Sequence, residues 1–230
     1  MREHMDTLAL SRYIAGLDET ARRAGIEIEI RTDFGHLMEL CEGLPDKPEP
    51  TAMFDPMKTD IGSHNGFWLK GCDTNGVPVH VQATRVYDMN GTNLGREISS
   101  LRAFYASPGL APEDEHCVCA APMAERISGT VCYHGELWVR GQEPNYRGKA
   151  LSRPLSRLLF GLVLARWSPD YVFAFAYDWT VMRGLPARYG YWHGQPGAVH
   201  WVRPYRDQPL DAWLLWLTRQ DLIDFMRIPA

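Results

Sequence analysis

Long apolar runs are missing from this sequence. The longest, from Leu158 to Ala165, is far shorter than the roughly 20 residues that a membrane-spanning helix requires. The opening segment, Met1 to Gly16, carries Asp6 and Arg12 where a signal peptide would be continuously apolar. We therefore expect a protein that neither crosses a membrane nor is exported.

Cysteine and positive charge are also scarce. The five cysteines, an odd number, argue against a disulfide framework and for a reducing compartment, so we expect a cytoplasmic protein. The 28 acidic residues outnumber the 24 Lys and Arg residues, which gives a net charge of -4. Bulk electrostatics therefore favour neither nucleic acid nor an anionic membrane surface as a partner.

Common catalytic and metal-binding motifs are absent as well. The sequence contains no Gly-x-Ser-x-Gly elbow, His-Glu-x-x-His helix or Walker loop, which excludes the commonest serine hydrolases, metalloproteases and nucleotide hydrolases. The residues His116, Cys117, Cys119, Cys132 and His134 lie near one another, but their spacing is atypical of a structural zinc site. We interpret them as buried thiols and solvent histidines, and expect no metal.

The composition and the periodicity of the chain predict a folded α/β protein. With 45% hydrophobic residues in 230, the chain can bury a substantial core, and we expect one domain over residues 1–230. A proline-rich, irregular stretch from Pro45 to Gly66 is a candidate lid. We expect helices at Asp6–Ala24, Phe34–Leu44, Leu94–Leu101, Ser152–Trp167, Val181–Tyr189 and Leu222–Met226, and strands at Ile26–Arg31, Phe67–Gly71, Val77–Tyr87, Gly129–Val139, Tyr171–Tyr177, Ala198–Pro204 and Trp213–Leu217.

The junction between the strand ending at Val139 and the helix beginning at Ser152 is a candidate anion site. We expect Ser152 to cap this helix, with Pro154 in its first turn. The unpaired amides and the dipole of a helix N-terminus attract anions such as a pyrophosphate. The basic residues around this junction, opposed only by Glu143, are Arg140, Arg147, Lys149, Arg153, Arg157 and Arg166. A basic, solvated helix face is the alternative interpretation.

This junction resembles the phosphate loop of the GNAT acyltransferases. In that family the loop reads Arg or Gln, two residues, Gly, one residue, then Gly or Ala, and its amides bind the pyrophosphate of coenzyme A. In the segment from Asn145 to Ser152, Arg147 takes the first position, whereas Ala150 and Ser152 stand where the family prefers glycine. The resemblance covers roughly Gly129 to Tyr191 and implies a mixed, mostly antiparallel sheet with helices on both faces.

The resemblance also implies a donor, an acceptor and a set of binding residues. It implies acetyl-CoA or a longer acyl-CoA as the small-molecule donor and an amine as the acceptor. The amides of Leu137 and Val139 would orient the pantetheine arm and polarise the thioester carbonyl. The residues that it assigns to cofactor binding are Leu137, Trp138, Val139, Arg147, Gly148, Lys149, Ala150, Leu151 and Ser152.

Acyl transfer to an amine needs a base for the amine proton and an acid for the leaving thiolate. Glu136 and Asp178 are candidate bases, because each lies at or near the end of a strand bordering the expected gap; each is equally explained as a surface carboxylate or a hydrogen-bond acceptor for a loop. The position of the family's usual acid, a tyrosine, is occupied by Pro186. Tyr189 or Tyr177 can replace it, although a tyrosine in such a segment is more often part of the core.

Three alternatives remain open. The segment Arg96–Phe104 is similar to a motif of the acyl-homoserine lactone synthases, which implies an acyl carrier protein as the donor; Arg85, Glu97 and Arg102 can instead form a buried ion-pair cluster. The altered glycines and the missing tyrosine also fit a non-catalytic GNAT-like protein that binds a thioester or a partner. Finally, edge strands near the C-terminus can pair two copies into a homodimer.

Overall fold

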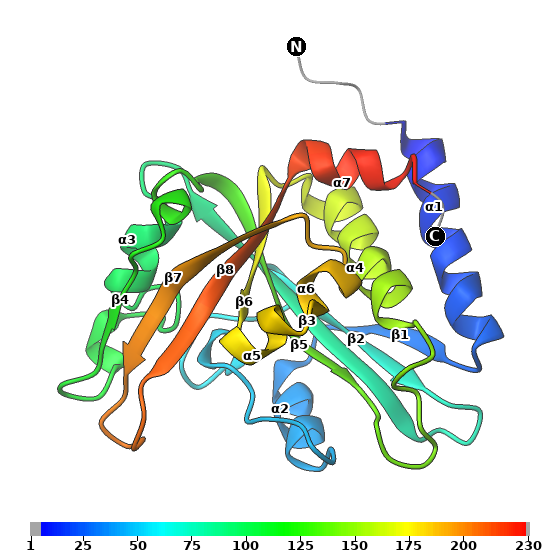
Figure 1. Cartoon of the computed structure of the whole chain (residues 1–230), viewed down its shortest axis with the longest axis horizontal. Helices are drawn as coiled ribbons and strands as arrows, with labels where there is room; N and C mark the ends of the chain where they lie inside the picture. The colour runs from blue at the N-terminus through cyan, green and yellow to red at the C-terminus, as the bar shows by residue number, and fades with distance from the viewer. Residues whose placement is uncertain (1–5, 229–230) are drawn as a thin grey trace.

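An eight-stranded mixed sheet organises the computed structural model, which describes residues 6–228 (Figure 1). The strand order is β1-β2-β3-β5-β6-β8-β7-β4. Within the described residues β5 and β6 pair in parallel, and the other neighbouring strands pair antiparallel. The strands are β1 (Glu27–Arg31), β2 (Gly66–Cys72), β3 (Pro78–Met89), β4 (His116–Val118), β5 (Gly129–Val139), β6 (Tyr171–Ala176), β7 (His193–Val202) and β8 (Leu210–Thr218).

Helices cover both faces of this sheet, which confirms the predicted fold class. On one face α1 (Thr7–Arg23), α4 (Ser152–Trp167) and α7 (Arg219–Phe225) enclose a core that includes Leu159 and Phe160. On the other face α2 (Phe34–Glu42) and α3 (Leu94–Ser99) enclose a core around Phe54 and Trp68. The short helices α5 (Asp178–Met182) and α6 (Leu185–Arg188) lie in the connection from β6 to β7.

The apolar stripe predicted for α4 is the stripe that packs against the sheet. Leu155, Leu158 and Leu159 are buried, and burying such a side chain contributes about 1.5–3 kcal/mol. The helix α1 approaches α4 closely at Gly161, where a Cβ atom would lie 3.0 Å from Cγ1 of Ile14. The helix ends as predicted, at Trp167, because Ser168 adopts the left-handed conformation (φ 43°).

The start of α4 differs from the prediction. Ser152 is the first helical residue, and Leu151 is the N-cap, with φ -80°, ψ -22° and no side-chain hydrogen bond to the helix. Leu151 is buried instead, so that apolar packing rather than a polar cap fixes the start of this helix. The expectation that Ser152 caps the helix was therefore wrong, and the first amides of α4 receive no hydrogen bond from the N-cap side chain.

Four further expectations are corrected by tertiary structure. The helix predicted over Val181–Tyr189 is two helices, α5 and α6, because Gly184 turns left-handed (φ 67°) before Pro186. The strand β4 was not predicted, since it consists of three residues in a proline-rich stretch and pairs with β7.

The last strands begin earlier than predicted, at His193 and Leu210, and α7 begins at Arg219 behind a Thr218–Asp221 capping box. β1 and β4 are the outermost strands of the sheet, and β4 pairs with β7 only from His200 to Val202; the homodimer stays a prediction.

Candidate functional site

The parallel strands β5 and β6 part halfway along their length. They pair only from Val131 to Tyr133 on β5 and from Tyr171 to Phe173 on β6, although β5 continues to Val139. The cause is a bulge in β5, where the register against β3 shifts and Glu136 takes a positive φ of 59°. Bulges bend a strand and end regular pairing. The result is a gap between the two strands, on the β6 side of residues 134–139.

Backbone groups at the end of β5 face this gap. The amide of Arg140 donates to the carbonyl of Val79 on β3 at 2.9 Å. Because the amides of a strand alternate between its two edges, those of Val139 and Leu137 point away from β3, toward the gap. The carbonyl of Val139 accepts from Nε of Arg147 at 2.8 Å, which holds that guanidinium at the mouth of the gap.

The loop that connects β5 to α4 folds back on itself. The carbonyl of Arg140 accepts from the amides of Tyr146 at 3.0 Å and Arg147 at 3.1 Å. Gly148 and Ala150 have positive φ values of 83° and 57°, so Ala150 occupies a conformation that costs an L residue about 1 kcal/mol or more. Glycine adopts this backbone conformation without such a cost.

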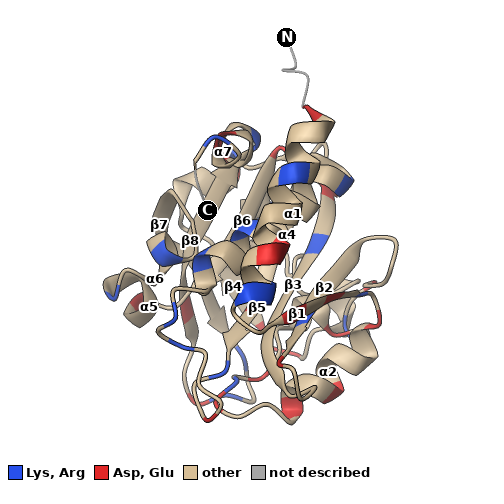
Figure 2. Cartoon of the chain, turned by 90° about the vertical axis from the view of Figure 1, so that its right-hand side faces the viewer, with Lys and Arg blue, Asp and Glu red and all other residues tan. Residues whose placement is uncertain are grey.

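The start of α4 combines amides that have no side-chain cap with basic side chains. Arg147, Lys149 and Arg153 are exposed there, and Lys149 lies over the ring of Tyr146 at 4.3 Å. Figure 2 looks onto this side of the molecule: Lys and Arg residues, in blue, lie beside α6, and α1 carries both basic and acidic residues. Helix termini of this kind stabilise a bound anion by about 0.3–1 kcal/mol at an exposed site, and positive side chains add to this.

Tyr189 lies beside this loop, although the whole of α4, β6, α5 and α6 separates it from Arg147 in the chain. Burial raises the pKa of the Tyr189 hydroxyl, and the charges of Arg147 and Arg188 oppose that rise. Tyr189 is half-buried at the end of α6. The structure thus brings together two residues that the sequence assigned separately, one to the phosphate loop and one to acid catalysis.

Glu136 is enclosed on the opposite face of β5 from α4. Its carboxylate forms an ion pair with Lys47, in which the two side chains are only 2% and 4% exposed. Its other oxygen accepts from the amide of Thr51 at 2.8 Å. The carboxylate is therefore an acceptor for the Pro45–Gly66 stretch, and its role as a base stays a prediction.

Asp178, the second candidate base, is exposed at the end of β6. It begins α5, and its Oδ1 accepts from Nε1 of Trp213 at 3.1 Å. Asp178 lines a groove of about 530 Å³ together with Tyr177, Trp179 and Arg203. The other residues that line this groove, Gln208 to Asp211, come from the β7–β8 connection and the start of β8.

Sequence reasoning missed Lys47, Thr51 and Tyr133. Tyr133 is buried at the point where β5 leaves β6, stacks on Phe54 at 5.4 Å, and lies next to Thr51. Burial raises the pKa of its hydroxyl, and the charge of Glu136 raises it further. The proline-rich composition of Pro45–Gly66 indicated a covering segment, but no periodicity identified which of its side chains would reach β5.

A buried polar network supports the other side of the gap. Nδ1 of His134 lies 2.9 Å from the hydroxyl of Tyr191, and its Nε2 lies 3.2 Å from Oε1 of Gln82. Gln82 in turn donates to the carbonyl of Leu155 in α4 at 2.6 Å. Burial lowers the pKa of His134 to about 3, so the ring is neutral at physiological pH. The network ties the parting point of β5 to the first turn of α4.

Two interpretations of polar residues are corrected. His134 is buried rather than solvent-exposed, and within residues 6–228 no group of three His, Cys, Asp or Glu side chains could hold a metal ion. Arg85, Glu97 and Arg102 form no ion pairs with one another: Arg85 donates to the carbonyl of Met53, and Glu97 accepts from Thr92. Among the described helices, none combines the length and the apolar character that crossing a membrane would require.

The comparisons with known proteins give matches at the level of structure. No family model matches the sequence, and a search of curated proteins finds no match. The aminoglycoside acetyltransferase AAC(6')-Ib with acetyl-CoA is 16% identical, with 90% of this chain and 98% of that chain covered and a TM-score of 0.44. Arabidopsis thaliana NAA60 with acetyl-CoA is 12% identical, covering 84% and 98%, with a TM-score of 0.47. A mutant of the Vibrio cholerae spermidine N-acetyltransferase SpeG is 8% identical, covering 86% and 97%, with a TM-score of 0.43. The chain is thus similar to solved acetyltransferases over most of its length.

Proposed function

We propose that this chain is a single GNAT-like domain that transfers an acyl group from acetyl-CoA or a longer acyl-CoA to an amine. One observation carries the proposal: the gap between the parallel strands β5 and β6 opens at the same end of the sheet as the basic loop and the uncapped start of α4. A pyrophosphate and a thioester arm require such adjoining sites, one for charge and one for an extended chain.

The donor would lie along the gap. Its pyrophosphate would bind the amides at the start of α4, with Gly148, Lys149 and Arg147 around it. Its pantetheine arm is an extended amide chain, so it can take the place of a strand against the amides of Leu137 and Val139. Trp138, Ala150, Leu151 and Ser152 complete the binding set by fixing the backbone of the strand and the loop.

The reaction would take place at the parting point of the two strands. The nitrogen of the amine attacks the thioester carbonyl, a base takes the amine proton, and the thiolate leaves with a proton from an acid. Asp178 is the better-placed base, because its carboxylate is exposed in a groove, whereas Glu136 is buried against Lys47. Tyr189, beside the phosphate loop, is the candidate acid.

Calorimetric titration with acetyl-CoA and octanoyl-CoA tests the donor site. We expect saturable binding to the wild type that Arg147→Glu abolishes, because the substitution places a negative charge at the mouth of the gap. Arg12→Glu, the same change on the exposed surface of α1, should bind as the wild type does. Absence of binding to either thioester, or equal binding by Arg147→Glu, contradicts the coenzyme A proposal.

A non-catalytic binding protein is the second candidate. The buried ion pair of Glu136 and the proline at position 186 favour it, since both remove groups that the reaction would use. Turnover measured with a panel of amines, with acyl-CoA and with acyl carrier protein as donors, separates the candidates. Thioester binding without turnover supports the binding protein, and turnover that Asp178→Asn reduces more than tenfold supports the enzyme.

A further inference from the structure

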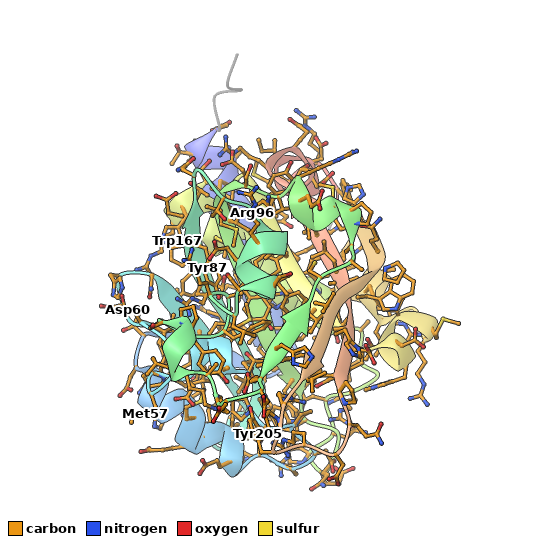
Figure 3. The ribbon with its side chains drawn as sticks, turned by 90° about the vertical axis from the view of Figure 1, so that its left-hand side faces the viewer. Met57, Asp60, Tyr87, Arg96, Trp167 and Tyr205 are labelled. Carbon is orange, nitrogen blue, oxygen red and sulfur yellow. The ribbon has the colours of Figure 1, made fainter. Side chains whose placement is uncertain are left out.

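A second cavity, of about 340 Å³, lies on the α2 face of the sheet and away from the phosphate loop. Its position along β3 is defined by register: His80 lies opposite Val139 at the phosphate-loop end, whereas the cavity is lined by β3 residues from Arg85 to Asp88. Figure 3 looks onto this side, with Asp60 and Tyr87 labelled. The volume is at the lower end of the range for small-molecule sites, about 300–1,000 Å³.

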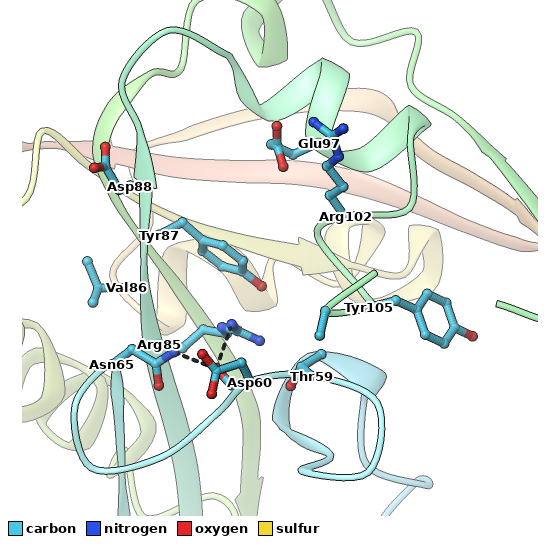
Figure 4. A pocket seen from close by; sticks show the side chains of 11 residues that line it. Thr59, Asp60, Asn65, Arg85, Val86, Tyr87, Asp88, Glu97, Arg102 and Tyr105 are labelled. Carbon is cyan, nitrogen blue, oxygen red and sulfur yellow. Dashed lines mark hydrogen bonds between the residues drawn. The ribbon is translucent and has the colours of Figure 1, made fainter. Parts of the chain in front are cut away.

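Arg85 is the buried cation of this cavity. Only 7% of its surface is exposed, and its guanidinium lies 4.5 Å from the centre of the Tyr87 ring. Its Nη2 donates to the carbonyl of Asp60 at 3.4 Å (Figure 4). Its Nη1 donates to the carbonyl of Met53 at 2.8 Å, and its Nε is buried without a partner. No carboxylate of residues 6–228 forms an ion pair with it. A buried guanidinium that meets neutral carbonyls and an aromatic ring, but no carboxylate, lacks the anion that would offset its desolvation.

Arg102 brings a second guanidinium to the same cavity. It comes from the loop after α3, it is exposed, and it has no ion pair within the described part of the chain. Figure 4 shows Arg102 above Arg85 and the ring of Tyr87, with its guanidinium beside Glu97 in this view. Two guanidinium groups on one cavity suit a carboxylate, which each can bind through charge-assisted hydrogen bonds.

Three carboxylates line the cavity without pairing with these arginines. The carboxylate of Glu97 accepts from the hydroxyl of Thr92 at 2.8 Å, and that of Asp88 accepts from the backbone amide of Asn90 at 3.0 Å. The carboxylate of Asp60 lies 3.6 Å from Nε2 of His64. They would repel a dianion such as phosphate, and the two arginines would repel a simple cation. A molecule with one negative and one positive charge satisfies both sets of groups.

We propose that this cavity binds a small zwitterion, an aminocarboxylate whose carboxylate lies against Arg85 and Arg102 and whose ammonium faces the carboxylates of Asp60, Asp88 and Glu97. The site is separate from the gap between β5 and β6, so it does not depend on the acyltransferase proposal.

Titration calorimetry with glycine, 4-aminobutyrate and 6-aminohexanoate tests the site and measures the separation of its charges. Butyrate and butylamine, which carry one charge each, and inorganic phosphate are the comparison probes. We expect at least one amino acid to bind saturably and at least tenfold more tightly than butyrate, butylamine or phosphate. Equal or tighter binding of any single-charge probe or of phosphate overturns the proposal, as does the absence of binding by all three amino acids.

Variants on the exposed rim identify the cavity as the binding site. Arg102→Gln should weaken the binding of the tightest-binding amino acid at least tenfold without changing the melting temperature, because Arg102 is exposed and forms no ion pair within the described residues. Arg96→Gln is the matched control: Arg96 is exposed on α3, labelled in Figure 3, and does not line the cavity. Asp60→Asn should weaken the binding of this amino acid but not that of butyrate, because butyrate has no ammonium group to face Asp60. An unchanged affinity in Arg102→Gln, or an equal loss in Arg96→Gln, contradicts the assignment.

Discussion

Replacing Lys47 with methionine should destabilise the protein strongly. The substitution keeps the length and the apolar stem of the side chain but leaves the carboxylate of Glu136 buried with only the amide of Thr51 as a partner. Removing one partner of a buried ion pair costs about 3–5 kcal/mol, because the remaining charge loses its compensation. For a chain of this size, each kcal/mol shifts the melting temperature by about 2–4 °C, so we expect a fall of roughly 6–20 °C.

The loss in the free energy of unfolding is measured by urea-induced unfolding of four proteins: wild type, Lys47→Met, Glu136→Gln, and the double variant. The double variant should lose less than Lys47→Met alone, since it leaves no unpaired charge, and the cycle should give a coupling free energy above about 1 kcal/mol. Arg22→Met is the control, because the Arg22–Asp18 pair is exposed, 65% and 30%, and surface pairs contribute about 0–1 kcal/mol. A loss below about 1 kcal/mol in Lys47→Met would refute the reasoning and show that water reaches the pair.

Three further predictions concern the gap and its supports. Burial lowers the pKa of His80 to about 4 and that of His134 to about 3, so the unfolded chain binds protons below pH 6.5 that the folded chain does not. The free energy of unfolding should therefore fall by about 1.4 kcal/mol per pH unit for each histidine as the pH falls from 6 to 4.5. A free energy of unfolding that does not change in this range contradicts the burial of both rings. Tyr191→Phe should cost about 1–3 kcal/mol in urea unfolding because Nδ1 of His134 loses its partner, whereas Tyr177→Phe, at an exposed side chain, should stay within about 0.5 kcal/mol. Ala150→Gly relieves the positive φ, so its stability should be unchanged or higher by up to about 1 kcal/mol, with thioester affinity retained; a loss above 1 kcal/mol would mean that Ala150 is unstrained.

The fold class was accessible from the sequence because its signals are local. The stripe on Ser152–Trp167 and the alternation in Gly129–Val139 gave α4 and β5 with their bounds nearly unchanged. The short strand β4 and the break at Gly184 were not accessible. A three-residue strand is stabilised by pairing with β7 rather than by its own pattern, and the break depends on how the chain turns between β6 and β7.

The candidate site, like the fold, could be predicted from the sequence only in part. The prediction of a phosphate loop over Arg147 to Ser152 rests on a contiguous motif, which is why it could be made from the sequence. The ion pair of Lys47 with Glu136 joins residues 89 positions apart, and the contact depends on a bulge that no pattern indicated. The proximity of Tyr189 to Arg147 likewise arises from the return of α6 to the loop.

Most of the longer helices and strands were accessible from the sequence, because hydrophobic periodicity and backbone propensity act over a few residues, and the anion-binding loop stays a prediction from the same local signals. Three features were found only in the folded chain: β5 parts from β6, Glu136 pairs with Lys47, and Arg85 and Arg102 line one cavity. These features depend on contacts between distant segments, whose energies depend on burial and geometry that exist only in the folded chain.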